Sequence, residues 1–311
     1  MGTSKKHLPV LFSEALDGLA IDPSGTYIDG TFGRGGHSGA LLDALGDKGR
    51  LLAIDKDPEA VAHGHSLFGS DDRFQIEQGS FAMLEQFADQ EGLTGRVSGV
   101  LLDLGVSSPQ LDTPERGFSF LKDGPLDMRM DNASGISAAQ WLAGAEVSDI
   151  ARVLKEYGEE RHAKRIARAI HEAGQLESIE TTARLAEIVS VANPAWEKGK
   201  HPATRAFQGI RIFINSELDD LISCLDQSLQ VLAPGGRLAV ISFHSLEDRI
   251  VKRFMRESER GDNFPPGIPV THEQMNSKLK RIGKATKSSA EEVERNPRSR
   301  SAVLRVAERL A

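Results

Sequence analysis

The sequence predicts an α/β fold whose mostly parallel, Rossmann-like sheet carries an inserted all-helical domain. Short apolar runs recur along the chain with helical stretches between them, which is typical of a parallel sheet covered on both faces. The fourth and fifth runs are separated by more than 130 residues, far more than one crossover connection needs. Because most of this interval has helical periodicity, we expect it to form a separate helical domain.

Six apolar runs are expected to be the strands of the sheet. They lie at residues 26–29, 51–55, 74–76, 100–103, 237–243 and 301–306. The first run breaks into a glycine-rich loop at 30–38, and a helix is expected at 39–45. This strand, glycine loop and helix together are typical of a ligand-binding turn in a doubly wound protein.

Further helices and loops are expected in the second half of the chain. A helix is predicted at 218–232, and another at about 246–254, which Ser245 can cap. The Gly/Pro-rich breaks near 261–269 and the Lys/Ser-rich stretch at 277–290 are expected to be loops.

The inserted domain is expected to consist of alanine-rich helices. These segments lie at 138–143, 147–157, 159–173 and 182–192. We therefore expect residues 1–135 and 201–311 to form the sheet domain. Residues 136–200 are expected to form the inserted helical domain, with a role in substrate recognition.

The composition is that of a globular protein without a membrane segment. Of the 311 residues, 39% are hydrophobic and 27% charged, and no apolar run approaches the roughly 18 residues that a membrane span needs. Residues 1–6 contain no apolar targeting segment, so a cytoplasmic protein without a membrane partner is expected. The single cysteine, Cys224, excludes an internal disulfide and a cysteine-based zinc cluster, and no metal site is expected.

The charge is distributed unevenly along the chain. A net charge of −7 argues against a nucleic-acid partner, because phosphate contacts come mainly from Lys and Arg. Residues 1–150 hold 11 basic against 23 acidic side chains, whereas residues 276–311 hold 10 against 4. The basic end is either a solvated tail or an RNA-facing surface, and composition alone does not decide between them.

The glycine loop and one carboxylate indicate a cofactor that contains a nucleoside. Gly33, Gly35 and Gly36 allow the backbone to approach a ligand at the carboxyl edge of the sheet, although a tight turn needs the same residue type. Asp55 ends the second strand, 26 residues after Asp29, where a carboxylate can accept hydrogen bonds from ribose hydroxyls. The alternative role for Asp55 is to cap the following helix.

Two cofactors compete for this pattern, a nicotinamide dinucleotide and S-adenosylmethionine (SAM). The dinucleotide fingerprint G-x-G-x-x-G fits imperfectly, because Ser38 stands in the place of its third glycine. Neither Tyr27 nor Tyr157 is followed four residues later by the lysine that a short-chain dehydrogenase uses. The sequence therefore lacks the side chains for hydride transfer.

Eight blocks of sequence, in a fixed order, indicate a family. They are YIDGTFGRGGHS at 27–38, LLDLGVSSPQLD at 101–112, ERGFSF at 115–120, LDMRM at 126–130, HPATR at 201–205, NSEL at 215–218, APGGR at 233–237 and SFHSLEDR at 242–249. With these blocks the chain resembles, from about residue 7 to 309, the RsmH (MraW) family of bacterial 16S rRNA cytosine-N4 methyltransferases.

The resemblance implies a class I SAM-dependent methyltransferase fold, with SAM as the cofactor. It also implies 16S rRNA of the small ribosomal subunit as the substrate, methylated at N4 of a decoding-centre cytidine. The ribose carboxylate of the family falls on Asp55 and its adenine-side residue on Phe81. With the glycine loop, the expected cofactor-binding residues are Gly33, Gly35, Gly36, His37, Asp55, Phe81, Asp103 and Gln110.

Asp103 is the expected catalytic residue. The 4-amino lone pair of cytosine is delocalised into the ring, so the amine needs a hydrogen-bond acceptor, and Asp103 ends the fourth strand near both ligands. The alternative is a carboxylate that only binds the cofactor. Carbon-5 methylation would need a nucleophilic cysteine, and Cys224 lies in the middle of an expected helix. Residues 103–106 also lack the base-stacking aromatic of the wider amino-methyltransferase pattern.

Basic residues of the insertion and the segment after it are expected to contact RNA, the alternative being a solvated face. The expected substrate-binding residues are Arg116, His201, Arg205 and Arg211; further basic residues are Arg161, Lys164, Arg165, Arg168, Lys198 and Lys200. The oligomeric state is left open, a homodimer included. A second hypothesis, from a different class, is a non-catalytic ribosome assembly factor that binds SAM and RNA.

Overall fold

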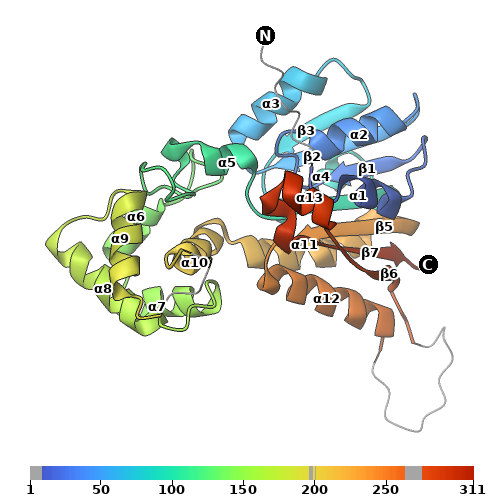
Figure 1. Cartoon of the computed structure of the whole chain (residues 1–311). Helices are drawn as coiled ribbons and strands as arrows, with labels where there is room; N and C mark the ends of the chain where they lie inside the picture. Colours follow the sequence, from blue (N-terminus) through green and yellow to red (C-terminus); the bar gives the residue numbers. More distant parts are fainter. Residues whose placement is uncertain (1–8, 196–198, 200, 263–274) are drawn as a thin grey trace, which may run out of the picture. The chain divides into compact units, whose positions relative to one another are not determined.

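The computed structural model describes residues 9–195, 199, 201–262 and 275–311, in two compact units (Figure 1). The sheet unit comprises Met1–Gly105 and Leu218–Ala311, and the helical unit comprises Val106–Glu217. Among the described helices, none combines the length and the apolar composition that a membrane crossing requires.

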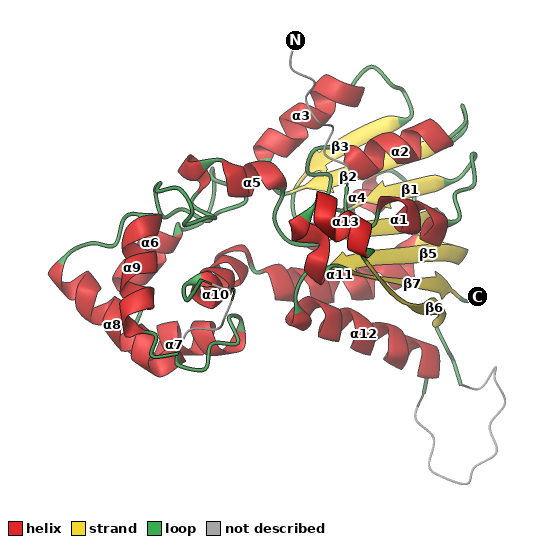
Figure 2. Cartoon of the chain, viewed as in Figure 1, coloured by secondary structure: helices red, strands yellow, loops and turns green. Residues whose placement is uncertain are grey.

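A seven-stranded sheet forms the centre of the sheet unit (Figure 2). Its strands, in the order β3-β2-β1-β4-β5-β7-β6, are β3 (Phe74–Gln78), β2 (Arg50–Asp55), β1 (Thr26–Asp29), β4 (Val97–Asp103), β5 (Leu232–Ser242), β7 (Val303–Arg309) and β6 (Leu279–Lys287). The first five are parallel, and β7 runs antiparallel between β5 and β6. All six expected strands are confirmed, and the mostly parallel sheet confirms the class I methyltransferase fold.

Helices cover both faces of this sheet. They are α1 (Phe12–Leu19), α2 (Gly36–Ala44), α3 (Pro58–Phe68), α4 (Leu84–Gln90), α11 (Glu217–Val231), α12 (Ser245–Arg260) and α13 (Ala290–Arg295). Successive side chains of a strand point to opposite faces, so Val100 and Leu102 of β4 pack with α4, α11 and α12, whereas Leu101 packs with α1 and α2. Because both faces are buried, β4 is a continuous apolar run.

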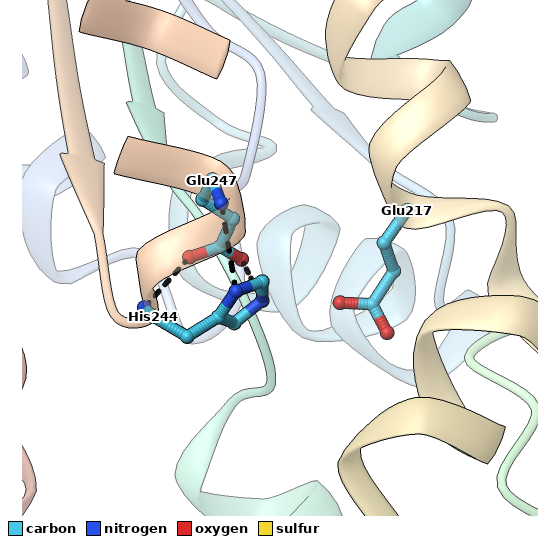
Figure 3. Close-up of side chains that lie close together, drawn as sticks. All are labelled: Glu217, His244 and Glu247. Atoms are coloured by element: carbon cyan, nitrogen blue, oxygen red, sulfur yellow. Dashed lines mark hydrogen bonds and ion pairs between the residues drawn. The ribbon is translucent and has the colours of Figure 1, made fainter. Parts of the chain in front are cut away.

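Two expectations in the second half of the chain are wrong. Residues 277–290 are not a loop, because they form β6 and the start of α13. Only Leu279 of β6 is buried, so this edge strand carries little apolar signal. The cap of α12 is not Ser245 but His244, whose Nδ1 accepts a hydrogen bond from the Glu247 N–H (Figure 3). The Gly/Pro-rich break near 261–269 lies outside the described residues from 263 on.

The helical unit extends beyond the expected range of 136–200 on both sides. Its helices are α5 (Ser108–Asp112), α6 (Ala138–Gly144), α7 (Val147–Glu156), α8 (Ala163–Leu176), α9 (Thr182–Ala192) and α10 (Thr204–Asn215). The four expected alanine-rich segments are confirmed as α6 to α9. Ile150 and Ile166 of these helices share one core with Leu126 and Phe207, so the loop before α6 and the helix α10 belong to the same unit.

Gly209 of α10 lies so close to the end of α7 that a side chain has no room. A Cβ at this position would lie 2.8 Å from the Gly158 nitrogen and 3.1 Å from the Val153 carbonyl oxygen. We expect Gly209→Ala to lower the free energy of unfolding by about 1–3 kcal/mol, measured from the urea midpoint. Gly174→Ala on α8, with nothing within 4 Å of its Cβ, is the matched control and is expected to be neutral or slightly stabilising. Equal effects of the two substitutions would contradict the packing.

Candidate active site

Three strands of the sheet end in aspartates at the same edge. β1, β2 and β4 are parallel and neighbouring, so Asp29, Asp55 and Asp103 all lie at the carboxyl edge of the sheet. The glycine loop that follows β1 starts from this edge as well. In open α/β sheets, ligands bind outside this edge.

The glycine loop between β1 and α2 is bonded to the strands on both sides. The Gly30 N–H donates to the Leu101 carbonyl of β4 at 2.9 Å. The Phe32 N–H donates to the Ile54 carbonyl of β2 at 3.1 Å. Gly35 has a φ of 73°, and a Cβ there would lie 2.7 Å from the Phe32 ring. Both the backbone conformation and the space therefore require glycine.

The other two expected loop glycines are constrained in similar ways. Gly33 has a φ of 55°, in the left-handed region. Gly36 begins α2, and a Cβ there would lie 2.5 Å from the Pro9 ring. All three loop glycines thus occupy positions where a side chain is strained or excluded.

Asp55 bonds the glycine loop, whereas the cap of α3 is Asp57. Asp55 Oδ2 accepts a hydrogen bond from the Gly33 N–H at 2.7 Å, and its Oδ1 accepts one from the Asp57 N–H at 2.8 Å. Asp57 in turn caps α3 by accepting from the Glu59 N–H. Burial raises the pKa of Asp55 to about 6, although the two amide donors lower it. At neutral pH the side chain is therefore a carboxylate that faces the loop.

Asp29 is a site residue that the sequence patterns did not single out. Its buried side chain accepts hydrogen bonds from the Ser38 hydroxyl at 2.7 Å and the Thr31 N–H at 3.1 Å. Burial raises the pKa of Asp29, while the Ser38 hydrogen bond lowers it. Thr31 Oγ1 accepts from the Asp103 N–H at 2.6 Å. This network connects the ends of β1 and β4 to both ends of the loop. The signal for Asp29 is the one that identified Asp55, a carboxylate at the end of a strand.

His37 and Asp103 carry buried polar atoms that have no hydrogen-bond partner among the described residues. His37, in the first turn of α2, is 5% exposed and stacks on Phe12 with ring centroids 5.9 Å apart. Its Nε2 lies 3.6 Å from Asp103 Oδ2. Burial lowers the pKa of His37, but Asp103 and Asp29 more than offset this, so the net shift is upward. Apart from this contact, which is longer than a hydrogen bond, both His37 ring nitrogens and Asp103 Oδ1 lack a hydrogen-bond partner within the described chain. Since buried polar groups are almost always bonded, these atoms indicate a ligand.

Phe81 lies at the same edge, after β3. It begins the short 3-10 helix η1 (Phe81–Met83), which Ser80 caps by accepting from the Ala82 N–H. Ser80 also donates to Asp220 of α11 at 2.6 Å, and Lys56 Nζ bonds the same carboxylate oxygen at 2.7 Å. Asp220 thus ties the ends of β2 and β3 to α11, a connection that no sequence pattern predicted.

Gln110, the last of the expected cofactor residues, belongs to the helical unit. It lies on α5 and is buried. Its Oε1 accepts a hydrogen bond from the Ser107 N–H at 2.9 Å, as part of a capping box. The seven other expected cofactor residues belong to the sheet unit, at the ends of the four adjacent strands β3, β2, β1 and β4.

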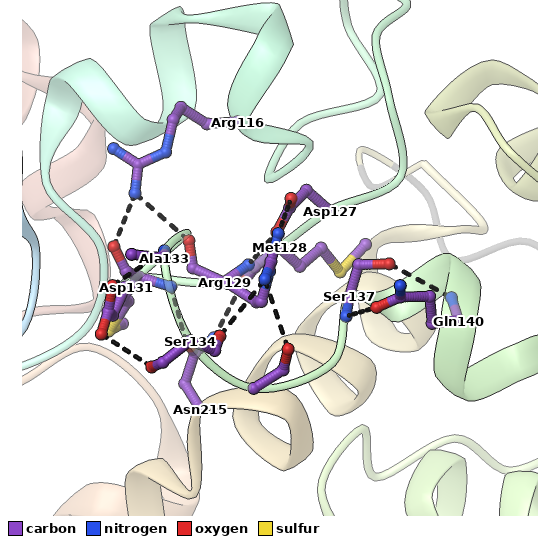
Figure 4. A network of polar contacts seen from close by, with 12 residues as sticks. Arg116, Asp127, Met128, Arg129, Asp131, Ala133, Ser134, Ser137, Gln140 and Asn215 are labelled. Carbon is purple, nitrogen blue, oxygen red and sulfur yellow. Dashed lines mark hydrogen bonds and ion pairs between the residues drawn. The ribbon is translucent and has the colours of Figure 1, made fainter.

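Arg116, an expected substrate contact, holds a loop of the helical unit (Figure 4). It is 6% exposed, and its Nη2 donates to the carbonyls of Arg129 and Met130 at 3.2 and 2.7 Å. Asn215 binds the same loop, donating to the Met128 carbonyl and accepting from the Met130 N–H, each at 2.7 Å. Met128 is fully buried with a φ of 64°, which non-glycine residues rarely adopt. The surrounding contacts therefore hold this loop in a strained conformation.

The three other expected substrate contacts also lie in the helical unit. His201 is exposed and stacks on Phe120 with ring centroids 4.5 Å apart. Arg205 is half-buried and donates to a backbone carbonyl of residue 159 at 3.3 Å. Arg211 forms a two-point ion pair with Glu217, with both N–O distances at 2.8 Å. Their roles in RNA binding stay predictions.

Comparison with known proteins shows the family of this chain. A model of the MraW methylase family matches residues 4–310. Ribosomal RNA small subunit methyltransferase H of Legionella pneumophila (strain Paris) is 60% identical over 306 residues, which are 98% of this chain and 99% of that protein. The protein of the same name from Thioalkalivibrio sulfidiphilus is 59% identical, covering 98% of each chain. A solved rRNA methylase from Streptococcus thermophilus aligns over 96% of this chain and 95% of its own, with 10% identity and a TM-score of 0.42.

Cys224 lies in the core of the sheet unit, as expected from its place in a helix. It is fully buried on α11, and burial raises the pKa of its thiol. We expect the folded protein not to react with an aromatic disulfide reagent at about pH 8, and the denatured chain to release one equivalent of thiolate. Cys224→Ala should give no signal in either state. Rapid reaction of the native protein would contradict the burial of Cys224. It would also make methylation of cytosine carbon-5 through a cysteine nucleophile a candidate again.

Proposed function

This chain belongs to the MraW methylase family, and from this membership we propose that it is a SAM-dependent methyltransferase of small-subunit ribosomal RNA. Relatives that are about 60% identical over almost the whole chain are named as methyltransferases of small-subunit ribosomal RNA. We further propose that the methyl acceptor is N4 of a decoding-centre cytidine in 16S rRNA. The sequence blocks that resemble the family support this finer assignment, and so does the chemistry of the site.

SAM is the methyl donor, and we place its site at the carboxyl edge of the sheet unit. When bound, it supplies an electrophilic methyl group whose leaving group is neutral. The edge fits an adenosyl group for two reasons. The carboxylate of Asp55 can accept hydrogen bonds from the ribose hydroxyls, and the loop glycines have no side chains that would block the cofactor from the loop backbone. The proposed cofactor contacts are Gly33, Gly35, Gly36, His37, Asp55, Phe81, Asp103 and Gln110.

Asp103 is the proposed acceptor for the substrate amine. The observation that supports this role is its Oδ1, which is buried at the site edge without a partner among the described residues. His37 Nε2 lies 3.6 Å from its other oxygen, Oδ2. A carboxylate that accepts a hydrogen bond from the amine localises the nitrogen lone pair and can take up the released proton. Methylation of nitrogen needs no cysteine, in keeping with the buried Cys224.

The helical unit is the proposed substrate-recognition domain. Arg116 is buried and Arg211 is ion-paired, so we expect contacts to RNA phosphates to come first from His201, Arg205 and the outer face of α8. That face carries exposed basic residues at one side of the helix, which are Arg161, just before α8, and Lys164, Arg165 and Arg168. The expected contacts Lys198 and Lys200 lie outside the described residues.

Asp103→Asn is expected to reduce turnover at least a hundredfold at saturating SAM, because general-base catalysis contributes about 10²- to 10⁴-fold. The amide keeps the size of the side chain but loses its charge. The measurement is incorporation of a labelled methyl group from SAM into undermethylated small subunits, with naked rRNA in parallel. The melting temperature of the variant should match that of the wild type.

Unchanged turnover of Asp103→Asn would remove this residue from the chemistry and leave it as a cofactor ligand. SAM binding by the wild-type protein without incorporation into either substrate would instead favour a non-catalytic assembly factor. The product nucleoside, identified after digestion of the RNA, tests the N4 position directly.

SAM affinity is expected to fall as the pH is lowered through the pKa of Asp55, which is about 6. Only the ionised carboxylate can accept hydrogen bonds from both ribose hydroxyls. The apparent Kd is therefore inversely proportional to the fraction of protein in which Asp55 is ionised. The Kd should therefore be roughly tenfold higher at pH 5 than at pH 7, measured by calorimetry. Asp55→Asn, the control, should bind more weakly at both pH values and lose most of this dependence. A wild-type Kd that stays constant over this range would contradict the ribose role.

A further inference from the structure

We propose that the exposed face of α12, extended by β6, binds the phosphate backbone of the RNA strand that flanks the target nucleotide. This inference rests on the proposed function and adds a second RNA-binding surface, one that belongs to the sheet unit.

Basic side chains form a stripe along α12. The inner face of the helix is apolar, with Val251 and Met255 buried in the core. The outer face carries exposed basic residues three or four positions apart, which are Arg249, Lys252, Arg253, Arg256 and Arg260. Residues at this spacing lie on one side of a helix, so the stripe is about 16 Å long at a rise of 1.5 Å per residue. This length can follow several successive phosphates.

The acidic side chains of α12 do little to neutralise this stripe. Glu247 is buried at the start of the helix, and Asp248 and Glu259 are bound by arginines of β7 and β6. Glu257 pairs with Arg253, whose side chain is 72% exposed. An exposed pair of this kind contributes little free energy, so Arg253 can exchange its partner for a phosphate.

β6 extends the basic surface beside α12, against which it packs. Residues 275–288 contain five Lys or Arg and no Asp or Glu. The pairing of β6 with β7 shifts register between Ile282 and Thr286, and Lys284 in this irregularity is exposed. Together, α12 and residues 275–288 hold ten basic and four acidic side chains, in a chain with a net charge of −7. Lysines on an edge strand also prevent unwanted strand pairing, so the arginine stripe is the stronger argument.

The stripe starts at the edge that holds the candidate active site. β5 is parallel to β4, and Ile241 pairs with Asp103. α12 begins at Ser245, three residues after the end of β5. An RNA strand with its target base at Asp103 can therefore continue along α12. Arginine suits this contact, because its planar fork matches phosphate and because phosphate contacts position a nucleic acid without reading its bases.

The test compares two variants that each remove two positive charges from the sheet unit. Lys252→Gln/Arg256→Gln changes exposed residues in the middle of the stripe, and Lys48→Gln/Arg96→Gln changes exposed residues just before β2 and β4, at the edge of the sheet opposite the candidate active site. Binding to small-subunit rRNA is measured with S-adenosylhomocysteine present, over a series of salt concentrations. Methyl incorporation and SAM affinity are measured alongside.

For the stripe variant we expect the slope of log K against log salt to become shallower by about 1 to 2, since each phosphate contact contributes about 0.7 to 0.9. The KM for RNA should rise several-fold while kcat and SAM affinity stay unchanged. The control variant should resemble the wild type. A wild-type slope in the stripe variant, or an equal loss in the control, would overturn the proposal while leaving the proposed function intact. Failure of the wild-type protein to methylate rRNA would overturn both.

Discussion

The whole carboxyl edge of the sheet depends on one buried carboxylate and the hydrogen bonds that it accepts. Asp29 holds Ser38 at the start of α2 and Thr31 in the glycine loop, and Thr31 holds the backbone of Asp103. Burying a carboxylate is unfavourable unless it is hydrogen-bonded, so these hydrogen bonds favour the observed arrangement of the loop. Because β1 lies between β2 and β4, this arrangement also sets where the loop stands relative to Asp55 and Asp103. The relative position of His37 and Asp103 then follows.

The fold was predictable where the local sequence pattern alone determines the secondary structure. β4 is apolar on both faces, so Val100 to Leu102 predict a central parallel strand from the sequence alone. β6 gave no such signal, because it is ordered by pairing with β7, and tertiary context decides such cases. The extent of the helical unit was not predictable either. Leu126 lies in a loop and Phe207 in a later helix, and only their shared core shows that they belong with α6 to α9.

The same distinction applies to the site. Asp55 and the loop glycines were predictable because a carboxylate at a strand end and a tight turn are local features. The roles of Asp29 and Asp220 depend on what each carboxylate faces, and that is set by residues far away in the chain. For Arg116 the sequence shows the charge of the side chain but not its surroundings. The sequence does not tell whether a guanidinium binds phosphate or, like Nη2 of Arg116, the backbone carbonyls of Arg129 and Met130.

The strand order also has a consequence for how the chain folds during its synthesis. β7 is the last strand along the chain, yet it lies inside the sheet, between β5 and β6. The sheet therefore cannot be completed while the residues of β7 are still inside the ribosome, although β1 to β4 emerge early. The helical unit is one continuous segment, Val106–Glu217, and can fold as soon as it has emerged. The helical unit should thus reach its native state before the sheet unit. Until β7 has been synthesised, the apolar strands of the sheet unit stay exposed and are prone to aggregate.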